Sequence, residues 1–188
     1  MQIDRSRVEK VVRDVLNESG PEQTDSGDVD RRGNDDLPIA LGADHGGFRL
    51  KEILKRYIEE ELGRSVKDVG THSEESCDYP DLAVRVARCV ASGECSRGIM
   101  IDGAGIGSSM AANRVPGVLA ACCHDVKTVV NSREHNNANV LTLGAGVVGR
   151  GLACQMVRIW LATEFGGGRH ERRVRKILDL EKQWTETS

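Results

Sequence analysis

The 188-residue sequence lacks an excess of charge of either sign, because 26 Lys and Arg residues stand against 29 Asp and Glu residues for a formal net charge of -3. A protein without a broad positive field has little with which to hold nucleic acid or an anionic membrane surface. We therefore expect no nucleic acid and no membrane among its partners, and only a local basic cluster could bind phosphate.

The sequence also lacks an apolar run long enough to span a bilayer, and Asp4 and Glu9 interrupt the amino terminus where a secretory signal would be apolar. Its six cysteines form no Cys-x-x-Cys pair, and we find no internal repeat and no metal-ligand spacing such as His-x-x-x-His. These absences favour a reduced, cytoplasmic setting with buried thiols and predict no metal site.

The first 36 residues differ in composition from the rest. Within residues 1–18, apolar residues recur at helical spacing after the Ser6 and Glu9 capping-box pattern, which predicts a short amphipathic helix. Residues 19–36 are nearly free of apolar side chains, as in a flexible linker. A tethered helix favours a docking element. Packing against its own domain or a dimer mate is an equal alternative.

Strand-like and helix-like patterns alternate through residues 37–188, which we expect to form the globular domain. The patterns predict strands over 37–41, 66–69, 98–102, 118–123 and 140–143. Helices are predicted over 48–62, around 82–90, after residue 107, and over 126–134, 148–163 and 169–183. This alternation predicts an α/β fold whose five-stranded parallel sheet is covered by helices on both faces.

The central stretch runs from Gly98 to Asn113. An apolar run of strand length ends at Asp102 and continues into a loop with three alternating glycines, Gly103, Gly105 and Gly107. Such a strand, loop and helix junction lies at the carboxyl edge of a parallel sheet, where ligands bind and free N–H groups attract anions. We expect Asp102 to point at the ligand, although the glycines could serve only a tight turn and close packing.

Polar residues recur in the loops that we expect to follow the strands, and we predict that they lie near one rim of the sheet. Each has a structural alternative: Asp44 could cap the helix that begins near Gly46, and a single histidine is more often a satisfied loop residue. The argument for a site is their convergence. The residues are Asp44, His45, Tyr79, Asp102, His135, Asn136, Asn137 and Asn139.

The one dense basic cluster covers residues 166–176. Arg169 and Arg173 are four positions apart, so on a helix they share a face and could clamp a phosphate with paired donors. The alternative is a solvated basic face.

Six motifs in the same order make residues 37–182 resemble the type B ribose-5-phosphate isomerases and the related galactose-6-phosphate isomerase subunits. The motifs lie at residues 42–48, 78–80, 103–107, 111–113, 132–140 and 167–174. The resemblance implies a Rossmann-like or flavodoxin-like three-layer α/β/α domain. It also implies homodimers or tetramers whose active sites take residues from both subunits. The implied reaction interconverts an aldose phosphate and its ketose through an enediol, without metal or cofactor. Ribose 5-phosphate, a substrate of the pentose phosphate pathway, is the family's default.

The resemblance also implies roles for individual residues. His135 resembles the residue that assists ring opening, and Asn136 the one that steadies the enediol. Asp102 stands where many members have a cysteine as the carbon-proton base. The remaining residues resemble substrate contacts, with the arginines donated by the neighbouring subunit and the glycine loop supplying N–H groups to the enediolate oxygen. They are Asp44, His45, Tyr79, Gly103, Gly105, Gly107, Ser108, Asn139, Arg169 and Arg173.

Three positions depart from the family pattern: Asp102 replaces the cysteine, Ala104 a threonine or serine, and Gly146 an arginine of the phosphate site. A carboxylate is a weaker base than a thiolate, and a helix N-terminus weakens it further, whereas burial under substrate strengthens it. We predict that desolvation prevails and that Asp102 abstracts the proton. The loss of the arginine at Gly146 leaves another pentose or hexose phosphate as an alternative substrate. The loss of the cysteine leaves a catalytically silent sugar-phosphate-binding homologue as a second alternative.

Residues 1–18 resemble the short amphipathic peptides that direct enzymes into bacterial microcompartments. The resemblance gives shell or core proteins as expected partners and a microcompartment within the cytoplasm as the expected location. A simple assembly helix or a cloning remnant is the alternative. Co-sedimentation with shell proteins, comparing the full chain with one that starts at Leu37, separates these readings: equal association of both would remove the targeting hypothesis.

Overall fold

The computed structural model describes residues 37–185, and their side chains as far as residue 180. The predictions for residues 1–18 and 19–36 lie outside the described residues. The strands are β1 (Ile39–Ala43), β2 (Val66–Asp68), β3 (Arg97–Asp102), β4 (Ala120–Cys122) and β5 (Val140–Gly144). The helices are α2 (Phe48–Arg56), the π-helix η1 (Tyr57–Glu61), α3 (Tyr79–Ala91), α4 (Ile106–Ala112), α5 (Val126–Glu134), α6 (Arg150–Ala162) and α7 (Arg169–Thr185).

The strands form one parallel sheet in the order β2-β1-β3-β5-β4, with Leu41 opposite Ile99 and Ile99 opposite Leu141. This confirms the predicted five-stranded parallel sheet and the flavodoxin-like three-layer class. The order differs from the flavodoxin order 2-1-3-4-5 only in the exchange of the last two strands. The chain leaves β1 toward β2 and returns to the other side of β1 as β3. The topological switch point therefore lies between the carboxyl ends of β1 and β3, where Asp44 and Asp102 stand.

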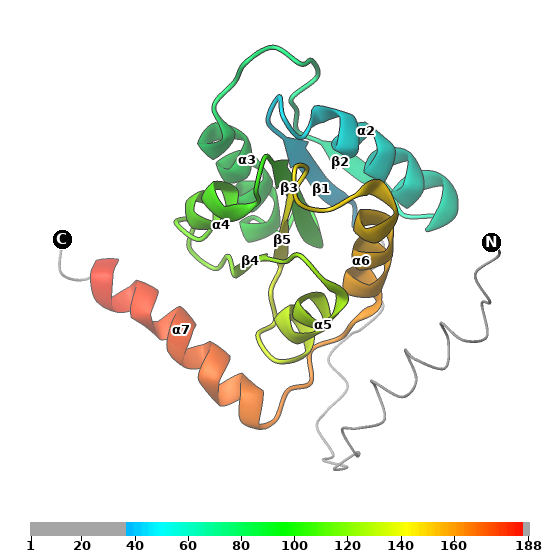
Figure 1. Cartoon of the computed structure of the whole chain (residues 1–188). Helices are drawn as coiled ribbons and strands as arrows, with labels where there is room; N and C mark the ends of the chain where they lie inside the picture. Colours follow the sequence, from blue (N-terminus) through cyan, green and yellow to red (C-terminus); the bar gives the residue numbers. More distant parts are fainter. Residues whose placement is uncertain (1–36, 186–188) are drawn as a thin grey trace, which may run out of the picture.

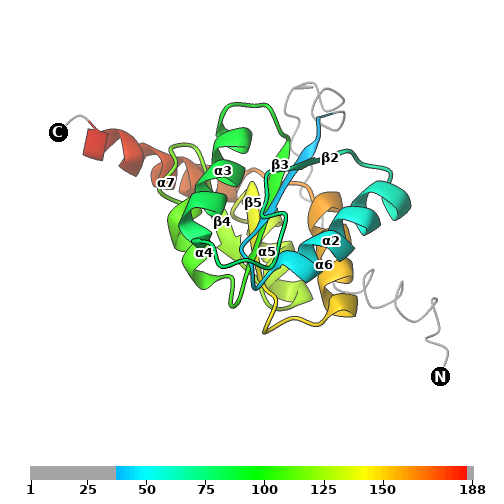
Figure 2. The same ribbon diagram turned by 90° about the horizontal axis from the view of Figure 1, so that it is seen from above.

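Alternate residues of each strand face opposite helical layers. Leu41, Ile99 and Leu141 pack with residues of α2, α5 and α6, whereas Ala40, Met100 and Val140 pack with residues of α3 and α4. Figures 1 and 2 show these two layers on either side of the sheet, with α7 extending away from the body of the domain. Both faces of the sheet are thus buried, as the unbroken apolar strands predict.

The carboxyl end of α6 is held by two arginines that lie close to Trp160. Arg97 donates to the carbonyl oxygens of Trp160 and Leu161, and Arg133 donates to that of Thr163. Their guanidinium carbons lie 5.6 and 5.9 Å from the Trp160 ring centroid. The last carbonyls of a helix have no partner within the helix, so these arginines supply the missing donors.

Within residues 37–185, no helix is both long and apolar enough to cross a membrane.

Candidate active site

One group of predicted site residues lies at the carboxyl edge of the sheet. We define the carboxyl-edge group as Asp44, His45, Tyr79, Asp102 and the glycine loop 103–108. The loops that carry it contact one another: the Asp44 N–H donates to Ile101 O at 3.0 Å, and the Gly146 N–H donates to Gly103 O at 3.0 Å. The sheet therefore brings the loops after β1, β3 and β5 together, as predicted for the ends of parallel strands.

Asp102 is 5% exposed and bonds to the loop that follows it. Its Oδ1 accepts from the N–H groups of Ala104, at 2.8 Å, and Gly105. Its Oδ2 accepts from the Ser108 N–H at 3.1 Å and from the Ser108 hydroxyl at 2.5 Å. Three of these donors are the backbone N–H groups that an anion at this loop would use. In this structure Asp102 itself fills that position.

Two glycines of the loop have a structural requirement as well. Gly105 has a φ of 80°, and a Cβ there would lie 2.9 Å from Cys122 Sγ. A Cβ on Gly107 would lie 2.6 Å from the ring of Tyr79, so the tyrosine packs directly over the loop. Tyr79 is 40% exposed. It can therefore contact both the loop and a ligand above it.

Asp44 and His45 fix the loop after β1. Asp44 is 7% exposed, and its Oδ1 accepts from the Gly47 N–H at 2.9 Å. The Nδ1 atom of His45 lies 3.3 Å from both the N–H and the carbonyl oxygen of Cys77. His45 therefore joins this loop to the segment that leads into Tyr79.

The prediction of one shared rim is wrong for the other residues. His135 is the C-cap of α5, and Asn139 directly precedes β5, with its carbonyl oxygen accepting from the Gly98 N–H near the start of β3. They therefore lie at the amino edge, and the length of β3, about 16 Å, separates them from Asp102. The physical reason is the direction of α5, which follows β4 and runs back across the sheet. We define the amino-edge group as His135, Asn136, Asn139, Arg169, His170 and Arg173.

The amino-edge group is organised around two stacked imidazoles. The rings of His135 and His170 lie 4.1 Å apart and 7° from parallel, which joins the end of α5 to the start of α7. Asn131 Nδ2 lies 2.8 Å from His135 Nδ1, and Arg169 Nε donates to His170 Nε2 at 3.4 Å. Partial burial, and then repulsion from His135, Arg169 and Arg173, lower the pKa of His170. A neutral His170 can accept the hydrogen bond from Arg169.

Asn139 and Arg133 hold the backbone beneath this group. Asn139 accepts from the Leu119 N–H at 2.8 Å and donates to Gly117 O at 2.9 Å, so its amide is bound to backbone. Arg133 is 5% exposed and donates to Ala138 O at 2.6 Å and Asn137 Oδ1 at 3.1 Å. Burial, with repulsion from Arg97, lowers the pKa of Arg133 to about 10, which still leaves it charged at neutral pH.

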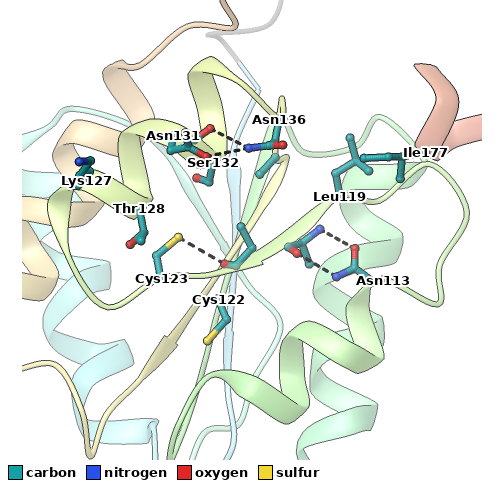
Figure 3. Close-up of a pocket in the computed structure, with 13 residues that line it drawn as sticks. Asn113, Leu119, Cys122, Cys123, Lys127, Thr128, Asn131, Ser132, Asn136 and Ile177 are labelled. Atoms are coloured by element: carbon teal, nitrogen blue, oxygen red, sulfur yellow. Dashed lines mark hydrogen bonds between the residues drawn. The ribbon is translucent and has the colours of Figure 1, made fainter. Parts of the chain in front are cut away.

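A groove of about 530 Å³ runs along the edge strand β4, from Cys122 toward Asn136 (Figure 3). Residues of β4, α5 and α7 line it, including Thr128, Asn131 and Ile177, and Ile177 is 46% exposed. The groove therefore reaches from the carboxyl end of β4 to the amino-edge group.

The chain matches the family described as Ribose/Galactose Isomerase over residues 39–177. The chain belongs to this family. It is 45% identical over 146 residues to ribose-5-phosphate isomerase B of Escherichia coli, covering 77% of this chain and 97% of that one. The family resemblance drawn from the six motifs is thereby confirmed, and the chain is an enzyme of the aldose-ketose isomerase class.

Two further relatives extend the comparison. The solved structure of Clostridium thermocellum ribose-5-phosphate isomerase B is 50% identical, with a TM-score of 0.77 and coverage of 79% of this chain and 99% of that one. The D-erythrulose-4-phosphate isomerase of Pectobacterium atrosepticum is 39% identical over 148 residues, covering 78% of this chain and 97% of that one. Sugar-phosphate isomerases of this family thus include proteins named for substrates of different length.

Sequence reasoning missed three features of this isomerase site. It did not find the His170 stack, the Arg133 hydrogen bonds or the contact between the Ser108 hydroxyl and Asp102. A histidine beside Arg169 in the basic cluster was the one available signal for His170. Among residues 37–180, no group of three or more His, Cys, Asp or Glu side chains is placed to hold a metal ion.

Proposed function

We propose that the chain interconverts an aldose phosphate and its ketose through an enediol, with ribose 5-phosphate and ribulose 5-phosphate as the default pair. The observation that carries the proposal is the glycine loop at the topological switch point, with two buried carboxylates at its margin. The 45% identity to ribose-5-phosphate isomerase B supports the five-carbon substrate. The relative named for erythrulose 4-phosphate keeps other sugar phosphates as candidates.

The reaction needs a base and an oxyanion partner. The proton leaves C2 of the open-chain aldose, the electron pair of that C–H bond forms the C1–C2 double bond, and the carbonyl oxygen gains negative charge. The hydroxyl proton on the C2 oxygen then passes to the C1 oxygen, and return of the abstracted proton to C1 leaves the carbonyl at C2, which is the ketose. We assign the base to Asp102 and stabilisation of the oxygen to the loop N–H groups that do not donate to Asp102, in agreement with oxyanion-hole chemistry. His135 would assist ring opening and Asn136 would steady the enediol.

We further propose a homodimer with shared sites. One chain keeps its two groups at opposite edges of the sheet, about 16 Å apart, which is too far for both to contact the reacting end of one pentose phosphate. The groove along β4 and the exposed Ile177 offer a second copy a surface between the two edges. A two-fold arrangement on this surface would bring Arg169 and Arg173 of one copy toward Asp102 of the other.

Exchange of the substrate C2 proton with heavy water tests the activity. The full chain is incubated with tetrose, pentose and hexose phosphates, and deuterium at C2 is followed by NMR. We expect exchange with ribose 5-phosphate at the highest rate. Faster exchange with another sugar phosphate would make that sugar the assigned substrate in place of ribose 5-phosphate. No exchange with any of them would support a silent sugar-phosphate-binding homologue.

Mixing two variants that are each inactive at low substrate concentration tests the shared site. Asp102→Asn removes the carboxyl-edge base, and Arg169→Ala with Arg173→Ala removes the amino-edge cations. If sites are shared, a mixed dimer has one site that contains all the substitutions and one site that contains none. About half of the dimers in an equal mixture are mixed, so the mixture regains about a quarter of full activity. No recovery, with mixed dimers demonstrated by mass spectrometry, would show that each chain builds its own site.

A further inference from the structure

The carboxylate assigned as base has no free acceptor position in this structure. Each carboxylate oxygen accepts at two lone pairs, and both oxygens of Asp102 already receive two donors. The residue is 5% exposed, so no side approaches open solvent. One donor must therefore leave before a carbon-bound proton can be accepted.

Three of the four donors are fixed by the backbone. They are the N–H groups of Ala104, Gly105 and Ser108, in a loop that Thr142 ties down by donating from Oγ1 to Gly105 O at 2.7 Å. Gly105 also sits against Cys122 Sγ and the backbone of Leu143, with no space for a Cβ. Moving any of these donors would require rebuilding the loop.

The fourth donor, the Ser108 hydroxyl, can leave by rotation about one side-chain bond. Ser108 is fully buried, so the rotated hydroxyl gives up a hydrogen bond to a charged acceptor, and this loss is part of the barrier to proton transfer.

We infer that Ser108 is a positioning residue for the isomerase reaction: its hydroxyl holds Asp102 Oδ2 in the resting site and releases it for proton transfer. The inference rests on the proposed function. During the reaction the C2 proton forms a bond to Oδ2, the C2–H electron pair becomes the C1–C2 double bond, and the same proton then passes from Oδ2 to C1. Ser108 gains and loses no proton.

The test compares Ser108→Ala and Ser108→Cys with the unsubstituted chain on C2-deuterated ribose 5-phosphate, so that proton transfer limits turnover. Loss of a hydrogen bond to a charged group frees Oδ2, and we expect kcat to rise about tenfold in Ser108→Ala with KM unchanged. The thiol of Ser108→Cys is a weaker donor, and its kcat is expected to fall between the two.

Ser109→Ala is the matched control. It removes the next hydroxyl of the same helix, which donates to Ala120 O at 3.3 Å and has no contact with Asp102. We expect kcat of this control to equal that of the unsubstituted chain. Thermal unfolding is measured for every variant, and Ser108→Ala is expected to melt at a lower temperature although its kcat rises.

If Ser108 releases Asp102 for proton transfer, Ser108→Ala raises kcat while it lowers the melting temperature. If kcat falls in Ser108→Ala together with the melting temperature, or equals that of Ser109→Ala, Ser108 only stabilises the loop and the inference is overturned. Failure of the proposed function looks different, because the unsubstituted chain itself would then turn over no sugar phosphate.

Discussion

The two edges of the sheet hold their polar side chains in opposite ways. At the carboxyl edge, Asp44 and Asp102 are 7% and 5% exposed and accept hydrogen bonds from their own loops. At the amino edge, the His135 side chain is 36% exposed and its neighbours are other side chains, His170 and Asn131. Side chains fixed by local backbone are ordered when the chain folds, whereas exposed ones lose freedom only when covered. The two carboxylates of the carboxyl edge are thus preorganised, whereas the His135 side chain of the amino edge is adaptable.

Asp102→Asn, a change at the carboxyl edge, should have the largest effect on both activity and stability. An asparagine amide has only one acceptor oxygen, so donors at the other position lose their partner. We expect C2 exchange to fall about 10³-fold or more and the free energy of unfolding to fall by about 2 kcal/mol. Urea unfolding measures the second effect. A rate of C2 exchange within tenfold of that of the unsubstituted chain would show that Asp102 is not the base. Asp102→Cys, which introduces the residue that the family resemblance implies at this position, should retain more exchange than the asparagine variant.

Arg133→Ala should destabilise the backbone that supports the amino-edge group. The variant leaves the carbonyl oxygens of Thr163 and Ala138 without this donor, so we expect a loss of about 3 kcal/mol in the free energy of unfolding. Arg175→Ala is the matched control: its ion pair with Glu171 is exposed and should be worth less than about 1 kcal/mol. Equal losses in urea unfolding would show that Arg133 is not the support we describe.

Arg169→Ala should affect substrate binding more than folding. Removal of one cation from the predicted phosphate clamp is expected to raise KM for a phosphorylated sugar about tenfold, with a smaller change in kcat. Arg172→Ala, an exposed cation on the same helix, provides the comparison in steady-state kinetics. An unchanged KM would place the clamp elsewhere.

Lowering the pH should reduce the stability of the protein in two steps, one for each edge of the sheet. We expect this effect to be smaller than those of the substitutions above. The lowered pKa of His170 means that the unfolded chain binds its proton first, so stability falls as pH drops below the ordinary value of 6.5. At the carboxyl edge, Asp68 is the last residue of β2; burial would raise its pKa, but hydrogen bonds from Lys51, the Gly70 N–H and Lys55 hold that pKa below its ordinary value of 3.8. That contribution is complete above pH 3.8 and is lost only as pH falls further.

Thermal unfolding across pH 3 to 8 checks this order. His170→Phe keeps a ring for stacking but cannot be protonated, so it should remove the decline between about pH 6.5 and 5 and leave the lower one. Asp68→Asn should do the reverse. If both variants showed the same single decline of melting temperature with falling pH, the two edges would not titrate independently.

Periodicity was sufficient to predict the layers of the fold. The helix predicted over 126–134 matches α5, and the predicted strands match β1 to β5 within a few residues. The alternation of apolar residues reports which face is buried, so it predicts these elements well. It did not predict that the helix over 48–62 changes from α2 to the π-helix η1 at Tyr57.

The site was harder to predict because its contacts join distant parts of the chain. His135 was placed at the wrong edge, since a residue that follows a helix lies opposite the residues that follow the preceding strand. The direction of α5 was implicit in the predicted element order, so this error was avoidable. The stack of His135 on His170 depends on the path of residues 163–168, where Gly166 donates to Glu134 O at 2.9 Å. No local pattern encodes such a contact.

The position of Trp160 gives the protein a built-in optical reporter. Its indole N–H donates to the Ser132 hydroxyl at 3.2 Å, and the guanidinium carbons of Arg97 and Arg133 lie 5.6 and 5.9 Å from its ring centroid. With Trp184→Phe it becomes the sole tryptophan of the sequence. Its fluorescence would then register water entering between α5 and α6, so loosening of that corner could be followed in real time without a chemical label.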